Sequence, residues 1–304
     1  MELGMIGLGK MGAFMTERLV RGGHRVIGLD RDPAAIQRVV EKGAGGADSL
    51  QKLIGQLKAP RAVWLMVPSG APVDQTIDQL VPLLSAGDTI IDGGNSYYKD
   101  SLRRAAALAP KKINFVDCGT SGGVWGLTEG YSMMVGGDAD VVKRLSPIFQ
   151  TLAPGPEKGW GRVGPAGAGH FVKMVHNGIE YGIMQAYAEG LDVIRHKKEF
   201  GVDLLQVGKI WQFGSVIRSW LLDLTVDALS KNPALEGIEA YVTDSGEGRW
   251  TVIEGVELGV PTPVMSSALD ARFRSQEPEP FANKLLAMMR HEFGGHAVKT
   301  AANK

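Results

Sequence analysis

The fold is decided by Gly164–His196, which has the sequence GPAGAGHFVKMVHNGIEYGIMQAYAEGLDVIRH. After its glycine-rich start the stretch lacks proline, and apolar residues recur every three or four positions, which predicts one long helix. These apolar residues are Phe171, Val172, Val175, Ile179, Gly182, Ile183 and Ala186. The other side of the helix carries Lys173, Asn177, Glu180 and Tyr181 within a sector of roughly 100°, with His176 at its edge. The helix therefore presents an amine, an amide, a carboxyl and a phenol in one row.

This polar row has two interpretations. The ordinary one is a solvated helix face. A functional face is favoured because an amide and a phenol are unusual on a surface that only has to be soluble. The glycines at positions 164, 167, 169, 178 and 182 also favour close approach of another backbone or of a ligand. If burial and neighbours adjust their pKa values, Lys173 and Glu180 can act as general base and general acid.

Length and composition narrow the class of protein. The 304 residues are 44% hydrophobic, which predicts a large core and two domains. The 33 basic and 33 acidic residues balance, so nothing in the net charge favours nucleic-acid or membrane-surface binding. Cys118 is the single cysteine, which excludes an internal disulfide and a cysteine-based zinc site, and we expect no metal. With no long apolar run and a first strand expected at Glu2, we predict a soluble, cytoplasmic protein.

The N-terminal segment carries a dinucleotide-binding fingerprint. MELGMIGLGKMG is a short apolar strand that runs into a glycine-rich turn and a predicted helix, Lys10–Arg21. A second strand, Arg25–Leu29, follows and ends at Asp30. In this setting the glycines allow the tight turn, the approach of a pyrophosphate and close helix–strand packing. The predicted phosphate-binding residues, at the start of the helix, are Gly7, Gly9, Lys10, Met11 and Gly12.

The choice between NAD and NADP depends on Asp30 and Arg31. A carboxylate at the end of the second strand accepts hydrogen bonds from the adenosine ribose and repels the 2′-phosphate of NADP. The guanidinium of Arg31 works in the opposite direction because it can bind that phosphate. We expect NAD, with NADP as a possible second cofactor.

Two further apolar runs are expected to be buried parallel strands, Arg61–Val67 and Thr89–Asp92. Each ends in a polar or glycine-rich turn, and such turns line the ligand crevice of open α/β sheets. The predicted cofactor-binding residues there are Val67, Pro68, Ser69 and Asn95. Asn95 has an alternative interpretation, as the N-cap of the helix that follows.

Another strand, Asn114–Gly123, ends in small residues. Ser121, Gly122 and Gly123 can present a hydroxyl and backbone amides to a carboxylate, although a flexible turn fits the same residues. Cys118, within the strand, is expected to be a buried filler. The next elements are expected to be a strand at Tyr131–Val135, a helix at Asp138–Leu152 and a strand at Gly161–Val163.

Strand patterns end before His196. Helices are predicted at Asp203–Gly208, Ser215–Ser230, Thr262–Arg274 and Pro280–Glu292, with a polar loop at Asp244–Trp250. The fold class is therefore α/β, a Rossmann-type doubly wound sheet followed by an all-helical C-terminal domain. We place the dinucleotide-binding domain at residues 1–165 and the helical substrate and oligomerisation domain at residues 166–304.

Over nearly its whole length the chain resembles 6-phosphogluconate dehydrogenase, a family of decarboxylating oxidoreductases of the pentose phosphate pathway and gluconate utilization. Beside the dinucleotide fingerprint, the resemblance rests on Asp92-Gly93-Gly94-Asn95-Ser96, on Ser121-Gly122-Gly123-Val124-Trp125-Gly126 and on Lys173-x-x-His176-Asn177-Gly178-Ile179-Glu180-Tyr181. The last two motifs are far more specific than any dinucleotide motif. The chain is similar to the short bacterial type, which lacks much of the larger helical domain.

The resemblance implies a role for each matching residue. Lys173 would be the base that takes the proton of the C3 hydroxyl, and Glu180 the acid that protonates C1 after CO₂ has left. The implied substrate-binding residues are Asn95, Ser121, Gly122, Gly123, His176, Asn177 and Tyr181, with Tyr181 at the phosphate. Arg290 and His296 match a family pair that reaches the substrate from a neighbouring subunit, so a homodimer or a dimer of dimers with shared active sites is expected.

Two departures from the family concern the substrate phosphate. The long type has a substrate-binding lysine in a KGTGKWT loop, and Ser245 occupies that position here. The family also has an arginine after the next helix. Arg272 and Arg274 are the candidates for it here, and we choose Arg274.

Two other functions remain open. A 3-hydroxyacid dehydrogenase of the hydroxyisobutyrate type shares the fold, the serine-glycine-glycine turn and the lysine, but would not need Glu180, Arg290 or His296. A non-catalytic NAD-binding sensor would need none of Lys173, Asn177 and Glu180.

Overall fold

The computed structural model describes residues 1–300, which form two compact units, one at Met1–Asn177 and the other from Gly178 onward. The boundary that we expect between residues 165 and 166 remains a prediction. Among the described residues, no helix combines the length and apolar character needed to cross a membrane.

The first unit is built on an eight-stranded sheet with the order β3-β2-β1-β4-β5-β6-β7-β8. The strands are β1 Glu2–Ile6, β2 Arg25–Leu29, β3 Gly45–Gly46, β4 Ala62–Leu65, β5 Thr89–Asp92, β6 Asn114–Ser121, β7 Ser132–Gly136 and β8 Trp160–Gly164. Only the β6–β7 pair is antiparallel among these pairings. The strand order reverses between β1 and β4, so the crevice at their carboxyl ends is the expected ligand site.

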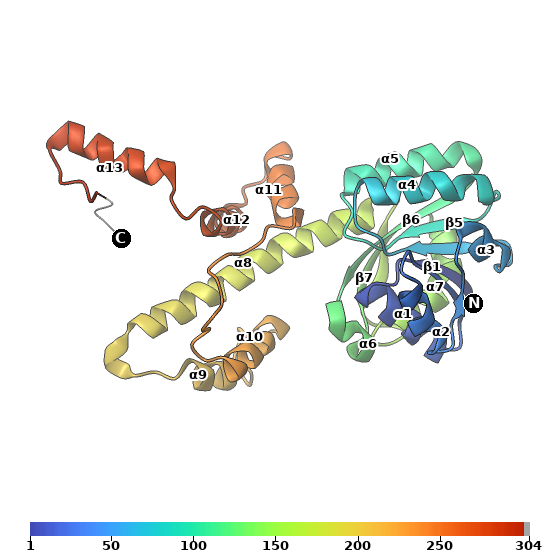
Figure 1. The fold of residues 1–304 in the computed structure, drawn as a ribbon, viewed down its shortest axis with the longest axis horizontal. Helices are drawn as coiled ribbons and strands as arrows, with labels where there is room; N and C mark the ends of the chain where they lie inside the picture. The colour runs from blue at the N-terminus through green and yellow to red at the C-terminus, as the bar shows by residue number, and fades with distance from the viewer. Residues whose placement is uncertain (301–304) are drawn as a thin grey trace. The chain divides into compact units, whose positions relative to one another are not determined.

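Helices cover both faces of this sheet (Figure 1). The helices of the first unit are α1 Lys10–Arg21, α2 Pro33–Val40, α3 Leu50–Gly55, α4 Ala71–Leu80, α5 Tyr98–Leu108, α6 Gly126–Glu129 and α7 Ala139–Leu152. One core cluster joins α1, α2 and α7 to the sheet and includes Trp64, whereas the other joins α3, α4 and α5 and includes Val63 and Leu65. Alternate residues of β4 thus enter opposite cores, as in a doubly wound fold.

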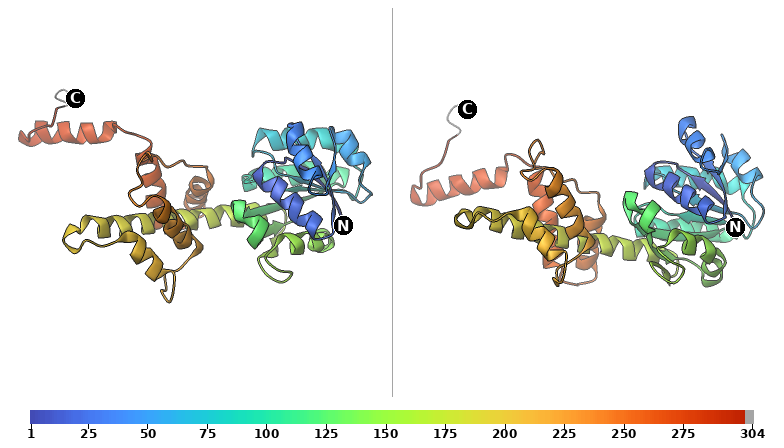
Figure 2. Two further views of the ribbon diagram at one scale, coloured as in Figure 1. Left: turned by 60° about the horizontal axis from the view of Figure 1, so that its bottom comes forward. Right: turned by 90° about the horizontal axis from the view of Figure 1, so that it is seen from below.

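The second unit is helical over its described residues. Its helices are α9 Leu204–Trp211, α10 Trp220–Lys231, α11 Glu247–Glu257, α12 Pro263–Ser275 and α13 Phe281–Gly294. The long helix α8, Ala168–His196, begins in the first unit and ends in the second, and it is uninterrupted in the views of Figure 2. Short 3-10 turns lie at η1 Val81–Leu83, η2 Ala109–Lys111, η3 Gly123–Trp125 and η4 Lys198–Phe200.

Several predicted boundaries are wrong. The loop expected at Asp244–Trp250 ends at Gly246, because α11 begins at Glu247 after a turn with a φ of +106° at Gly246. Because that segment is polar and rich in glycine, its composition predicted a loop and not the start of a helix. α10 begins at Trp220 rather than at Ser215, because the Ser219 hydroxyl caps it by accepting from the Leu222 amide at 3.1 Å.

The ends of two strands also differ from expectation. β4 ends at Leu65, two residues before the predicted end at Val67, and β6 ends at Ser121 rather than Gly123. In both places apolar or small residues continue beyond the last ladder pair, so composition alone does not mark the end of the strand. The residues after each strand therefore belong to the turns.

Candidate active site

The glycine-rich turn after β1 has the geometry that its spacing predicts. Gly7 has a φ of +92°, and a Cβ added there would lie 2.4 Å from the Met66 carbonyl oxygen. At Gly12 an added Cβ would lie 2.0 Å from the Gly7 carbonyl oxygen, so α1 packs directly on the turn. At Gly9, which caps α1, no atom lies within 4 Å of an added Cβ.

This turn fits a dinucleotide. The open space at Gly9 lies at the start of α1, where the first backbone amides of a helix have no partner within the helix. Those amides include Lys10 and Met11. Their direction and the partial positive charge of the helix end suit a pyrophosphate. A bound pyrophosphate would be held mainly by backbone atoms of this turn.

Asp30 lies one residue after β2 and supports the same turn. Its Oδ2 accepts a hydrogen bond from the Leu8 amide at 2.6 Å, and its Oδ1 accepts one from the Asp32 amide at 2.9 Å. Arg31 is exposed, and Asp32 caps α2 through the Ala34 amide. The Asp30 carboxylate therefore has a fixed orientation next to the glycine-rich turn, at the position where a ribose is bound in this fold.

The turns after β4 and β5 contain the next predicted residues. Pro68, Ser69 and Asn95 are exposed, and Val67 is partly buried. The interpretation of Asn95 as a helix N-cap is wrong, because α5 begins at Tyr98 and no side chain caps it. Asn95 is held in a turn, not at a helix end, and its amide remains available to a ligand.

The turn after β6 has a defined backbone conformation, with φ angles of +131° at Gly122 and +51° at Gly123. A Cβ at Gly122 would lie 3.3 Å from the Gly130 carbonyl oxygen and from the Tyr131 ring. Ser121, the last residue of β6, is partly buried. Such a glycine pair presents its backbone groups in a conformation that other residues rarely adopt.

Lys173 lies in the first half of α8 and is buried, with 6% of its surface exposed. Its Nζ donates to the Oδ1 of Asn177 at 2.5 Å and lies 3.4 Å from the Nδ1 of His176. The His176 Nδ1 is also 3.1 Å from the Asn177 Oδ1. The amine is thus held by two side chains one turn along the same helix, and little of the residue is exposed to solvent.

The start of α8 is fixed to the sheet by Asp117, a fully buried residue of β6. Its two carboxylate oxygens accept hydrogen bonds from the Gly167 amide at 2.6 Å and the His170 amide at 2.8 Å. A carboxylate at this place also suits the helix dipole. At Gly119 an added Cβ would lie 2.3 Å from the Cβ of Lys173. The position of Lys173 therefore depends on a carboxylate and a glycine of the neighbouring strand.

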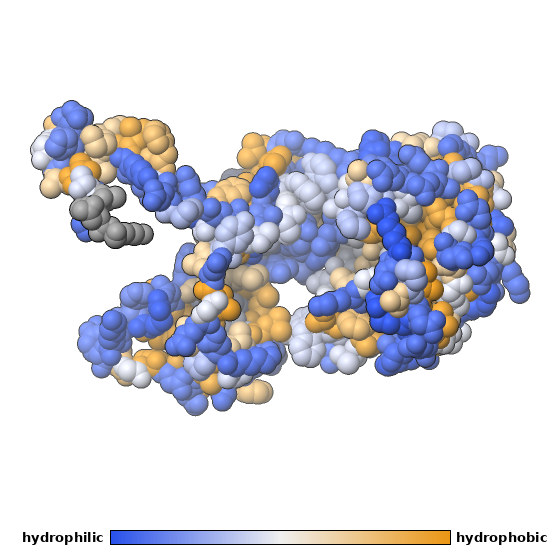
Figure 3. All heavy atoms as spheres, in the orientation of Figure 1, coloured by the Kyte–Doolittle hydropathy of each residue, from blue (hydrophilic) through white to orange (hydrophobic). Residues whose placement is uncertain are grey.

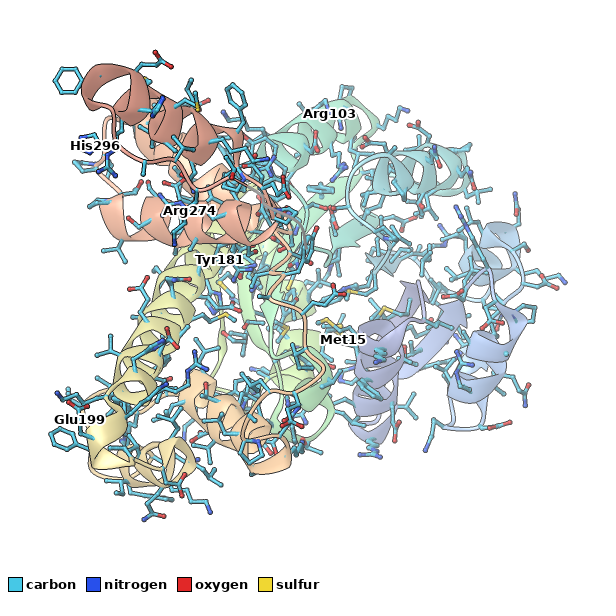
Figure 4. The ribbon with its side chains drawn as sticks, turned by 60° about the vertical axis from the view of Figure 1, so that its left-hand side comes forward. Met15, Arg103, Tyr181, Glu199, Arg274 and His296 are labelled. Atoms are coloured by element: carbon cyan, nitrogen blue, oxygen red, sulfur yellow. The ribbon has the colours of Figure 1, made fainter. Side chains whose placement is uncertain are left out.

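Tyr181 lies two turns further along α8 and is 5% exposed. Its hydroxyl is hydrogen-bonded to the Ser245 Oγ at 3.1 Å, and that Oγ donates to the buried Glu247 at 2.6 Å. The guanidinium of Arg272 stacks on the Tyr181 ring, 3.5 Å from its centroid. Arg274, which we chose from the sequence, is an exposed residue of α12 (Figure 4).

The interpretation of the α8 polar row as a solvated face is wrong for three of its residues, because Lys173, Asn177 and Tyr181 are all buried. Glu180 is partly buried. Exposure is instead found on the apolar side, where Ile179 is 52% exposed. The expected close approaches do occur, since an added Cβ at Gly178 would lie 2.7 Å from a Thr251 methyl group.

Arg290 and His296 are exposed residues at the C-terminal end of the described chain. Arg290 lies on α13, and His296 follows it, with its carbonyl oxygen accepting from His291 at 3.0 Å. His296 is labelled in Figure 4. Cys118 is fully buried, as expected, and burial raises the pKa of its thiol to about 12, which excludes a thiolate nucleophile near neutral pH.

Sequence reasoning missed the residues that support these side chains. Asp117 stood out only as an acid inside an apolar strand, which is a signal that a buried partner exists. Arg104 gave no local signal, because an arginine in an amphipathic helix is usually exposed. Its partners come from other elements, which are described below.

Comparison with known proteins places these observations in a family. The profile for the NAD binding domain of 6-phosphogluconate dehydrogenase matches residues 2–162, and that for the 6-phosphogluconate dehydrogenase C-terminal domain matches residues 169–289. A Haloferax volcanii protein named as an NAD(+)-dependent, decarboxylating 6-phosphogluconate dehydrogenase is 42% identical over 299 residues, which cover 98% of each chain.

Solved structures give the same result. The chain superimposes on a Plasmodium falciparum 6-phosphogluconate dehydrogenase, solved with NADP+ and with 6-phosphogluconate, with a TM-score of 0.83 and 29% identity, covering 100% of this chain and 67% of that one. A Mycobacterium tuberculosis 3-hydroxyisobutyrate dehydrogenase has a TM-score of 0.72 at 22% identity, covering 88% of this chain and 91% of that one, which shows a shared fold alone. The chain therefore belongs to the 6-phosphogluconate dehydrogenase family.

Proposed function

We propose that this chain catalyses the oxidative decarboxylation of 6-phosphogluconate to ribulose 5-phosphate and CO₂ with NAD as oxidant. The observation that carries the proposal is the buried Lys173 amine, held by Asn177 at 2.5 Å on a helix that also bears Glu180. The family membership supplies the substrate class, and the glycine-rich turn supplies the cofactor site. A place in the pentose phosphate pathway and a cytoplasmic location remain predictions.

Lys173 acts first, as the general base. When held at the glycine-rich turn after β1, NAD would supply the oxidising power, as the acceptor of a hydride from C3 of the sugar acid. The neutral amine of Lys173 removes the proton of the C3 hydroxyl, so that the C3–O bond becomes a carbonyl. The Asn177 oxygen orients the amine by accepting a hydrogen bond from it at 2.5 Å.

Loss of CO₂ follows from the β-keto acid. The C1–C2 bond breaks and its electron pair forms an enediol, while the protonated amine of Lys173 donates to the C3 oxygen. Glu180 then delivers a proton to the carbon that carried the carboxylate. The neutral amine of Lys173 takes back the hydroxyl proton at the former C3, whose carbonyl re-forms to give ribulose 5-phosphate. Both groups lie on one helix, seven residues or about two turns apart.

The other residues hold the substrate. Its hydroxyls and carboxylate contact Asn95, Ser121, Gly122, Gly123, His176 and Asn177. At the phosphate we propose Tyr181 with Arg272 in place of our sequence-based choice, Arg274. The support is geometric, since Arg272 stacks on the Tyr181 ring and donates to the Thr243 carbonyl oxygen at 2.8 Å, which fixes its guanidinium.

The active site is completed by a second copy of the chain. α13 has no buried residue among those described, and apolar side chains gather along one side of it (Figure 3). Its large exposed apolar residues are Phe281, Leu285, Leu286, Met288, Met289 and Phe293. A helix with such a surface is ordinarily covered by another chain. Docking on a partner would bring Arg290 and His296 to the partner's substrate.

Steady-state assays test the reaction directly. With 6-phosphogluconate and NAD, the protein should release CO₂ and NADH in equal amounts, and NADP should be used with lower kcat/KM because Asp30 repels a 2′-phosphate. Turnover of 3-hydroxyisobutyrate without CO₂ would instead support the hydroxyacid dehydrogenase alternative. NAD binding without turnover of either substrate would support a sensor.

A further inference from the structure

A buried ion-pair network lies beneath the two turns that are expected to face the cofactor. At its centre is Arg104 of α5, whose side chain is 2% exposed. Its Nη1 donates to the Oδ2 of Asp92 at 3.1 Å, and its Nε donates to the Oδ1 of Asp74 at 2.7 Å. Its Nη2 donates to the Gly70 carbonyl oxygen at 3.1 Å. One guanidinium therefore bonds three separate segments of the chain.

The partners of Arg104 determine the shape of both turns. Gly70 ends the turn after β4 with a φ of +83°, and Asp74 lies in the first turn of α4. Asp92 is the last residue of β5 and is fully buried. Its Oδ1 accepts from the Gly94 amide at 3.2 Å, and its Oδ2 accepts from the Ser96 hydroxyl at 2.7 Å. Asn95 is thus held on both sides by residues bonded to Asp92.

The chemistry of the network explains why an arginine stands at this position. A buried charge is tolerated only when it is paired and its hydrogen-bonding capacity is met. Arg104 meets this condition by using three nitrogens on three acceptors, with two carboxylates nearby. A lysine ammonium is a compact charge without a planar fork, so it cannot bridge these acceptors in the same geometry.

We infer that Arg104 is a positioning residue for cofactor binding, which holds the Val67–Gly70 turn and the Gly93–Ser96 turn at one fixed separation. This inference rests on the proposed function, because it takes these turns to be the walls of the NAD site. Arg104 does not itself touch the cofactor. Its loss would let the two turns move independently, and affinity for the dinucleotide would fall although every contacting residue remains.

The adjacent arginine provides a matched control. Arg103 donates to Asp74 at 2.9 Å and to Asp100 at 3.1 Å, and its side chain is more than half exposed (Figure 4). It shares Asp74 with Arg104, but the described contacts include none from Arg103 to either turn. Arg103→Gln therefore removes one positive charge from the same helix and leaves the link between the turns in place.

The test measures the dissociation constant for NADH by fluorescence titration, without substrate, in the wild-type chain and in Arg104→Lys, Arg104→Ala and Arg103→Gln. We expect Kd to rise by roughly 10- to 100-fold in both Arg104 variants, which is at most the order that a misplacement of about 1 Å can cost in a reaction rate. Arg103→Gln should keep the wild-type Kd. Arg104→Lys conserves the charge and is the variant expected to fold if Arg104→Ala does not.

A second measurement separates positioning from general stability. Millimolar guanidinium ion should restore NADH affinity to Arg104→Ala, because it can occupy the same three acceptors, whereas methylammonium should not. A wild-type Kd in Arg104→Lys, or equal weakening in Arg103→Gln, would overturn the inference. Since substrate is absent from the titration, failure to turn over 6-phosphogluconate contradicts the proposed reaction only.

Discussion

At the scale of single residues, the proposed chemistry depends on Lys173 and Glu180. A positioned general acid or base typically contributes roughly 10²–10⁴-fold to a rate, so Lys173→Ala and Glu180→Gln should each lower kcat by that order. The Kd for NADH should stay the same in both variants, because neither residue lies in the glycine-rich turn. Steady-state measurement of NADH formation gives kcat, and fluorescence titration gives the Kd for NADH. Near-normal turnover in Lys173→Ala would exclude it as the base.

The phosphate end gives a second residue-scale prediction, which compares two arginines of one helix. A hydrogen bond to a charged group contributes about 1.5–3 kcal/mol, so Arg272→Gln should raise KM for 6-phosphogluconate by roughly 10- to 100-fold. Arg274→Gln is the matched control, since Arg274 is exposed two residues further along α12. If Arg274→Gln has the larger effect on KM, the sequence-based choice was correct and the stacking of Arg272 on Tyr181 is structural.

At the scale of elements, the sequence predicted those helix and strand bounds that depend on residues close by in the chain. The bounds of α1 and β2 agree with the sequence because Gly9 and Gly22 flank α1, and because Asp30 ends the apolar run of β2. α11 was missed because its glycines and charges are typical of a loop, whereas its formation depends on packing against Tyr181, which an added Cβ at Gly248 would contact at 2.4 Å. The row on α8 was found, but its burial could not be predicted, because Asp117 and Gly119 are about fifty residues away in sequence.

The contact between β6 and α8 leads to a prediction at Gly119. An alanine Cβ there would overlap Lys173, with its Cβ at 2.3 Å and its Cγ at 3.0 Å, and would lie 2.8 Å from the Gly169 carbonyl oxygen. Overpacking typically costs about 1–3 kcal/mol, so Gly119→Ala should lower the melting temperature and displace the lysine. We expect kcat to fall while NADH affinity stays close to wild type.

Gly161→Ala is the control for this experiment, because no atom lies within 4 Å of an added Cβ at that strand position. It tests the cost of alanine in the same sheet without contact to α8. Unchanged kcat in Gly119→Ala, measured well below its melting temperature, would show that α8 can shift without loss of function and that the position of Lys173 is not set by this strand.

At the scale of the whole molecule, the residues of the proposed site fall into two sets with different surroundings. Lys173, Asn177 and Tyr181 are buried within the chain, whereas Arg290 and His296 are exposed. An arginine and a histidine suit a phosphate or a carboxylate, and the exposed apolar side of α13 fits our proposal that this segment docks on a second copy of the chain. The resemblance implies both the pair and its action in a neighbouring subunit, and this role in the partner's site remains a prediction.

Mixing two inactive variants distinguishes a shared site from one built within a single chain. Lys173→Ala removes the base from the chain's own site, and His296→Ala removes a group that we assign to the partner's site. If sites are shared in a two-fold dimer, each mixed dimer contains one doubly altered site and one intact site. Random pairing of equal amounts makes half of the dimers mixed, so co-expression should restore roughly a quarter of wild-type sites. If His296 acts within its own chain, every site keeps one substitution, and kcat measured per site stays at the level of the separate variants.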